Sequence, residues 1–90
     1  MNIERKYIIS PKNNIMKDDD IAIINSGELV IVLEKFELEL INKLDGRLKL
    51  KDISIQLEEK YSETYVEADF YNFITELFNL EVIEEIYEDQ

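Results

Sequence analysis

The chain has 90 residues, a length that suits one small domain with little interior to spare for a catalytic pocket. Its formal net charge of -11 repels phosphate, so we expect neither a nucleic acid nor an anionic membrane as a partner. The chain has no cysteine and no histidine, which excludes disulfides, thiol chemistry, Cys/His zinc sites and histidine acid-base catalysis.

Hydrophobic residues make up 46% of the chain, which is enough for a folded core although 34% of the residues are charged. No apolar stretch has the length of a signal peptide or a membrane-spanning helix, so we expect a cytoplasmic protein. We expect residues 1–90 to form a single domain whose core spans about residues 21–83.

The first predicted strand is residues 6–10 (KYIIS), a short β-prone run that ends at Pro11. Residues 12–20 (KNNIMKDDD) follow as a polar connection. The strand is expected to join the next two in one antiparallel sheet.

The second and third predicted strands are residues 21–25 (IAIIN) and 28–33 (ELVIVL). Asn-Ser-Gly between two apolar runs predicts a hairpin, because Asn and Gly accept positive φ. Leu29 to Leu33 is a run of five aliphatic residues, so this strand is apolar on both faces. Either both faces are covered within the monomer, or one side stays open to a partner.

Two helices follow. The first starts near residue 34 and ends at Asp45-Gly46, and its apolar stripe comprises Leu33, Phe36, Leu40, Ile41 and Leu44. The second spans about residues 51–61, with a buried face of Leu50, Ile53, Leu57 and Tyr61.

The third predicted helix lies within residues 62–86 and has more apolar surface than one contact needs. One stripe is expected to face the core: Val66, Phe70, Phe73, Leu77 and Leu80. A second stripe, about 100° round the helix, holds Tyr71 and Phe78, with Ile74 between it and the core. The residues after Leu80 are either a short strand or a frayed helix end.

No catalytic motif accompanies these elements. None of the serines (Ser10, Ser26, Ser54 and Ser62) stands in a recognisable nucleophile motif, and the two glycines form no phosphate-binding loop. The acidic clusters at residues 18–20 and 84–85 lack the ligand spacing of a calcium loop, so they indicate solvated charge. We expect no enzyme activity, no cofactor and no metal.

Three strands followed by three helices resemble the PqqD-like family, the peptide-recognition domains (RiPP recognition elements) of pathways that modify ribosomally made peptides. The resemblance covers about residues 21–83 and is clearest in LVIVLEKFELELINKLDGRLKLKDISIQLEEKY, with Leu-x-x-x-Leu-Asp-Gly at residues 40–46. Phe73, Leu77 and Ile83 match the closing helix of the family. Where that helix often ends in Leu-Gly, this chain has Leu80-Glu81. The resemblance implies an α+β fold like a winged helix-turn-helix, a three-stranded antiparallel sheet followed by three helices.

The resemblance also implies a non-catalytic function. A leader segment of a precursor peptide would add as a strand beside the third strand and enter the groove between that strand and the third helix. A modifying or processing enzyme, either a radical SAM enzyme or a lasso-type leader protease, would then act on the peptide. The implied peptide-binding residues are Leu29, Val30, Ile31, Val32 and Leu33 on the strand, with Glu67, Tyr71, Ile74 and Phe78 on the helix.

An unpaired apolar strand edge also pairs with copies of itself, so we expect a monomer or a weak homodimer through the third strand.

A winged-helix transcription regulator is disfavoured, because SETYVEADFYNFITEL has four carboxylates and no basic residue. An acyl carrier protein needs Asp-Ser-Leu, and here Ile53 separates Asp52 from Ser54. A small acidic winged-helix interaction or immunity protein remains an alternative.

Overall fold

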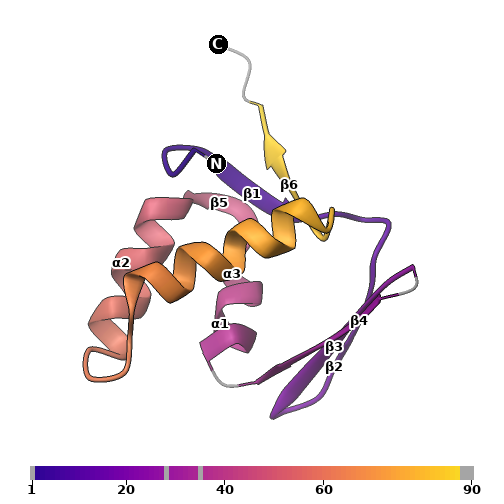
Figure 1. The fold of residues 1–90 in the computed structure, drawn as a ribbon, viewed down its shortest axis with the longest axis horizontal. Helices are drawn as coiled ribbons and strands as arrows, with labels where there is room; N and C mark the ends of the chain where they lie inside the picture. The colour runs from indigo at the N-terminus through magenta and orange to yellow at the C-terminus, as the bar shows by residue number, and fades with distance from the viewer. Residues whose placement is uncertain (1, 28, 35, 88–90) are drawn as a thin grey trace.

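The computed structural model describes residues 2–27, 29–34 and 36–87, which form an α+β structure (Figure 1). Its strands make two three-stranded sheets, ordered β2-β3-β4 and β5-β1-β6. The strands are β1 (Lys6–Ile9), β2 (Asn14–Lys17), β3 (Ile21–Ser26), β4 (Leu29–Glu34), β5 (Asp45–Lys49) and β6 (Ile83–Ile86). The helices are α1 (Phe36–Lys43), α2 (Leu50–Lys60) and α3 (Glu67–Asn79).

The predicted hairpin of β3 and β4 is confirmed. Ser26 pairs with Leu29, and Gly27 has a φ of 65°, a value that glycine adopts at little cost. Glu28, expected at the start of the second strand of the hairpin, lies outside the described residues. The inner face of the sheet buries Ala22, Ile24 and Leu33 in the core.

The prediction that residues 6–10 join this hairpin in one sheet is wrong. β1 is the middle strand of the other sheet, between β5 and β6. The third strand beside the hairpin is β2, inside the stretch expected to be a polar connection. Ile15 of β2 lies opposite Ile24 and packs against the core, so one inward apolar residue suffices to hold this edge strand.

The predicted extents of the first two helices are confirmed to within about two residues. Lys35, which falls within the first predicted helix, lies outside the described residues. Gly46 was expected to cap that helix, but it lies within β5 and has a φ of 84°. A Cβ atom at this position would come within 2.6 Å of Ile86 and 3.0 Å of Ile8, so glycine lets β5 pack closely on its neighbours.

α3 ends in a Schellman turn centred on Glu81. The Val82 N–H donates to the Leu77 carbonyl at 2.9 Å, the Glu81 N–H donates to the Phe78 carbonyl at 3.0 Å, and Glu81 has a φ of 61°. This turn directs the chain into β6, so the residues after Leu80 form a short strand rather than a frayed helix end. Residues 88–90 of the expected tail lie outside the described part of the chain.

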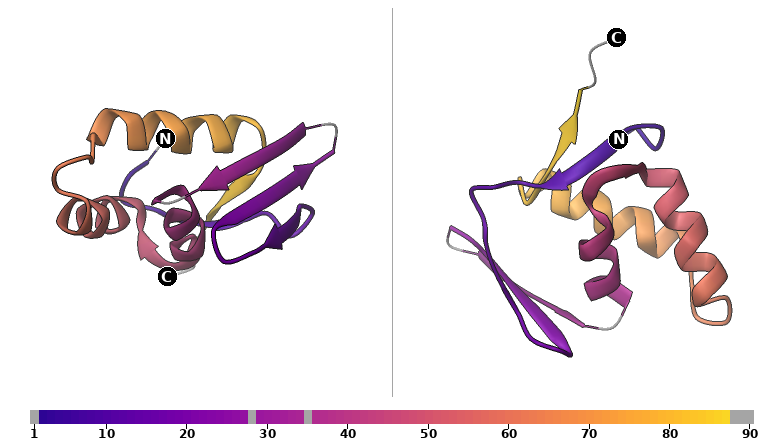
Figure 2. Two further views of the ribbon diagram at one scale, coloured as in Figure 1. Left: turned by 90° about the horizontal axis from the view of Figure 1, so that it is seen from below. Right: turned by 180° about the vertical axis from the view of Figure 1, so that it is seen from behind.

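α3 crosses the molecule between α2 at one end and the β3-β4 hairpin at the other (Figure 1). Seen from two further directions, the β3-β4 hairpin and β6 lie toward the C-terminal half of this helix (Figure 2). The core side chains of α3 are Phe70, Ile74 and Leu77, each at most 1% exposed. Because these three residues fix the rotation of the helix, the two flanks of α3 face different strands.

The left-handed backbone conformation of Glu81 can be tested by measuring the stability of variants. A left-handed conformation costs a non-glycine residue roughly 1–2 kcal/mol, whereas glycine adopts it freely but loses more chain entropy on folding. We expect Glu81→Gly to raise the free energy of unfolding by about 0.5–1 kcal/mol, or Tm by about 2–8 °C, in a thermal melt. Glu81→Ala is the control, because it removes the exposed Lys12 ion pair and keeps the strain. If Glu81→Ala has a Tm equal to or above that of Glu81→Gly, the backbone of Glu81 is not strained.

Candidate functional site

β4 is an edge strand. It pairs with β3 on one side, and no described residue pairs with it on the other. A two-residue hairpin closes on a hydrogen-bonded pair, here Ser26 and Leu29, and hydrogen-bonded pairs alternate along an antiparallel ladder. The main-chain N–H and C=O groups of Val30 and Val32 therefore point to the open edge.

A groove of about 410 Å³ lies between this edge and α3. Most of its lining is apolar, and Glu76 is the one charged side chain among the described residues that line it. Val30 is 59% exposed and Val32 is 54% exposed, so this apolar strand is left uncovered by the described part of the chain. We call this the β4 groove, and its lining comprises Leu29, Val30, Ile31, Val32, Phe73, Glu76, Leu77 and Leu80.

The strand residues expected at the site are mostly where the sequence indicates. Leu29, Val30, Ile31 and Val32 line the β4 groove. Leu33 does not, because it pairs with Ala22 on the inner face of the sheet and is 1% exposed. Leu33 is therefore a core residue that anchors the end of the strand.

The helix residues expected at the site lie elsewhere, and their assignment to the wall of this groove is wrong. Ile74 is fully buried in the core. The Tyr71 ring packs edge-on against Phe70, with 4.9 Å between ring centroids. Phe78 lies on the other flank of α3 against Tyr7, at 6.1 Å between ring centroids. The fourth residue expected here, Glu67, is exposed in the first turn of α3.

The error comes from the rotation of α3. The expected core stripe ran through Val66 and Leu80, yet these are 51% and 40% exposed. The true core face includes Ile74, which turns the helix by about 50° from the expected orientation at 100° per residue. Phe73 and Leu80 then reach β4. The apolar character of Phe73 and Leu80 was the one sequence feature that could have indicated the groove wall. The helical pattern alone assigns it to the core stripe.

No helix in the described ranges is long and apolar enough to cross a membrane. Among residues 2–27, 29–34 and 36–87, no group of three or more acidic side chains is arranged so that it could hold a metal ion.

The chain was compared with protein-family models, with curated proteins and with solved structures, and none of the three comparisons found a match.

The rotation of α3 can be tested by stability. Ile74→Ala empties a fully buried site, so we expect a loss of about 2–5 kcal/mol in the free energy of unfolding. Phe78→Ala removes a larger side chain, but Phe78 is 40% exposed, so we expect a loss of only about 1–2 kcal/mol in the free energy of unfolding. Urea unfolding of both variants measures the difference. A Phe78→Ala protein that loses as much stability as Ile74→Ala would place Phe78 in the core.

Proposed function

We propose that the chain captures an extended segment of another polypeptide as an added strand on β4. The observation that carries this proposal is the open edge of β4 beside an apolar groove. β-strand addition uses these two features together: main-chain hydrogen bonds supply affinity, and side-chain pockets beside the edge supply specificity.

The main-chain contribution follows from the register of β4. Val30 and Val32 each offer one N–H and one C=O to an added strand, and each hydrogen bond contributes about 0.5–1.5 kcal/mol. This contribution does not depend on the bound sequence. Selectivity must therefore come from side chains.

The side chains of an added strand alternate between two faces. One set would lie on the side of Ile31, where Phe73, Leu77 and Leu80 form the helix wall of the β4 groove. The other set would lie beside Val30 and Val32 on the outer face. We expect the captured segment to carry apolar residues at every second position, because the groove wall is apolar apart from Glu76.

We further propose that the captured segment is the leader of a ribosomally made precursor peptide and that the domain is a PqqD-like, winged-helix recognition element. In support of that layout, β2, β3 and β4 precede α1, α2 and α3 along the chain, although β5 lies between α1 and α2. Glu81 supports it as well, because it has a φ of 61° at the position where the family often has glycine. The proposed role is non-catalytic: the domain raises the concentration of the precursor at its modifying or processing enzyme.

The test is calorimetric titration with the leader segment of a candidate precursor peptide. Phe73→Ala truncates the groove wall, so we expect a loss of about 2 kcal/mol, roughly 30-fold in affinity. Val32→Pro removes an N–H that faces the edge, so we expect binding to be lost while the fold is kept. A thermal melt of each variant checks the fold.

Phe78→Ala is the matched control, because it deletes the same side chain from the other flank of α3 and is expected to leave precursor affinity within about twofold. Val32→Ala controls for the side chain of Val32. Binding that survives Val32→Pro, or that depends on Phe78 and not on Phe73, refutes capture at β4. A homodimer that persists at saturating precursor would show that β4 is occupied by a second copy instead.

A further inference from the structure

A second groove, of about 590 Å³, lies on the other flank of α3, beside β6. It is distinct from the β4 groove, since the two share no lining residue. It combines aromatic and aliphatic side chains with carboxylates. We call it the β6 groove, and its lining comprises Lys12, Phe78, Asn79, Glu81, Ile83, Glu84, Glu85 and Tyr87.

β6 is also an edge strand. It pairs with β1 on one side, and within the described ranges no strand pairs with its other side. The Ser10 N–H donates to the Val82 carbonyl at 2.8 Å, so this carbonyl points toward β1. Since the main-chain groups of successive residues alternate in direction along an antiparallel strand, the N–H and C=O groups of Ile83 and Glu85 point to the open edge. The β6 groove therefore offers main-chain partners as well as side chains.

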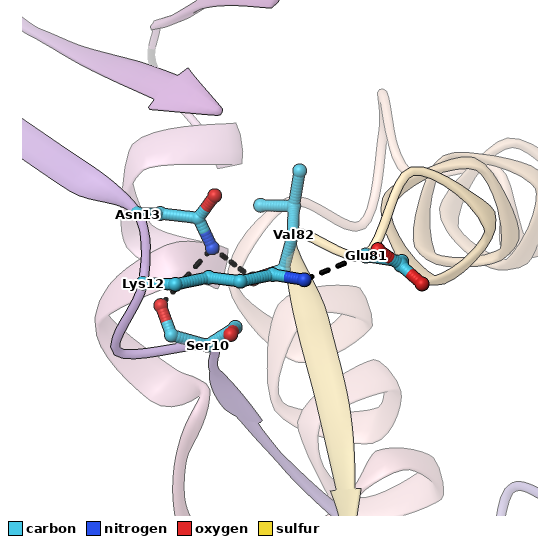
Figure 3. A network of polar contacts seen from close by, with 5 residues as sticks. All are labelled: Ser10, Lys12, Asn13, Glu81 and Val82. Carbon is cyan, nitrogen blue, oxygen red and sulfur yellow. Dashed lines mark hydrogen bonds and ion pairs between the residues drawn. The ribbon is translucent and has the colours of Figure 1, made fainter. Parts of the chain in front are cut away.

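The loop after β1 holds the start of this groove in place (Figure 3). The Asn13 side-chain amide donates to the carbonyls of Ser10 at 3.0 Å and Val82 at 3.1 Å. The Lys12 ammonium pairs with the Glu81 carboxylate at 3.1 Å. These contacts tie the loop to the turn between α3 and β6, so this end of the β6 groove is formed before a ligand arrives.

The charges of the β6 groove are unbalanced. Three carboxylates, on Glu81, Glu84 and Glu85, face one ammonium on Lys12, which leaves two negative charges in excess. Glu85 accepts a hydrogen bond from the Tyr7 hydroxyl at 3.1 Å. Burial, and less strongly this carboxylate, raise the pKa of Tyr7. Glu84 is exposed, and its side chain has no hydrogen bond or ion pair to any other described residue.

The same charges decide which occupant fits. Two copies of β6 paired edge to edge would bring their glutamates together, and the repulsion between like charges disfavours such an interface. A cationic segment would instead be attracted by these glutamates. Its ammonium or guanidinium groups would neutralise the excess carboxylates, and the exposed Phe78 ring offers a face for cation-π contact. The Tyr87 ring already has the Arg5 guanidinium of the same chain over it, at 5.7 Å from the ring centroid.

We propose that the β6 groove binds an extended segment of a second protein that bears lysine or arginine residues. The segment adds as a strand on β6, and its basic side chains reach the glutamates of the groove. Since β4 and β6 lie on opposite flanks of α3, a segment bound at β6 leaves the β4 groove accessible. This inference concerns a different edge from the proposed peptide capture and does not rest on it.

The experiment uses amide chemical shifts of the full chain, which report the two edges separately. The probe is a short peptide that alternates lysine and valine, and the control probe alternates glutamate and valine. We expect the lysine probe to shift the amides of Ile83 and Glu85 and to bind there about tenfold more tightly than the glutamate probe. Added salt should weaken this binding. The shifts should persist in Val32→Pro, where the β4 edge is blocked.

Variants complete the test. Glu84→Lys is expected to weaken the lysine probe at β6 about tenfold. Glu59→Lys, on the exposed end of α2, makes the same change in net charge and is expected to leave this affinity unchanged. Equal binding of both probes at β6, or no binding there, overturns the proposal and leaves the glutamates only the role of preventing self-pairing. Shifts at Ile83 and Glu85 that grow with protein concentration alone would assign the edge to a second copy, which also overturns it.

Discussion

The burial of one face of α3 is the constraint on which the rest of the structure depends. Phe70, Ile74 and Leu77 are almost completely buried, and together they set the rotation of the helix. At about 100° per residue, fixing one face of a helix places every other side chain. Phe73 and Leu80 therefore face β4, and Phe78 faces β6. The positions of both grooves therefore follow from the burial of this one face of α3.

The two grooves differ in chemistry although they share a helix. The β4 edge carries aliphatic residues and one nearby carboxylate, so it suits an apolar strand. The β6 edge carries three glutamates, so it suits a basic one. Main-chain hydrogen bonding would be similar at both edges, and side-chain charge would distinguish the two proposed partners. The net charge of -11 would add a general attraction for cationic partners.

The second sheet shows why the N-terminal strand is hard to place from sequence. β1 pairs with β5 and β6, whose residues lie about 40 and 77 positions further along the chain. β5 (DGRLK) reads as a turn because Asp-Gly is a turn signal, and the sequence of β6 (IEEI) fits a frayed helix end as well as a short strand. Tyr7 makes this pairing favourable, since its ring is buried against Phe78 and its hydroxyl bonds to Glu85. None of these contacts is local.

The sequence by itself determined α1, α2, the β3-β4 hairpin and the strand half of the candidate site. The apolar periods of α1 and α2, the Ser26-Gly27 hairpin, and the run from Leu29 to Val32 are all set by neighbours within a few residues. Only the tertiary structure decided which flank of α3 faces β4. Both flanks carry an aromatic residue, Phe73 on one and Phe78 on the other, so the helical pattern alone is nearly symmetric. The packing of Ile74 into the core distinguishes the two flanks. This packing forms only when the two sheets and α3 come together, so the sequence of the helix alone does not reveal it.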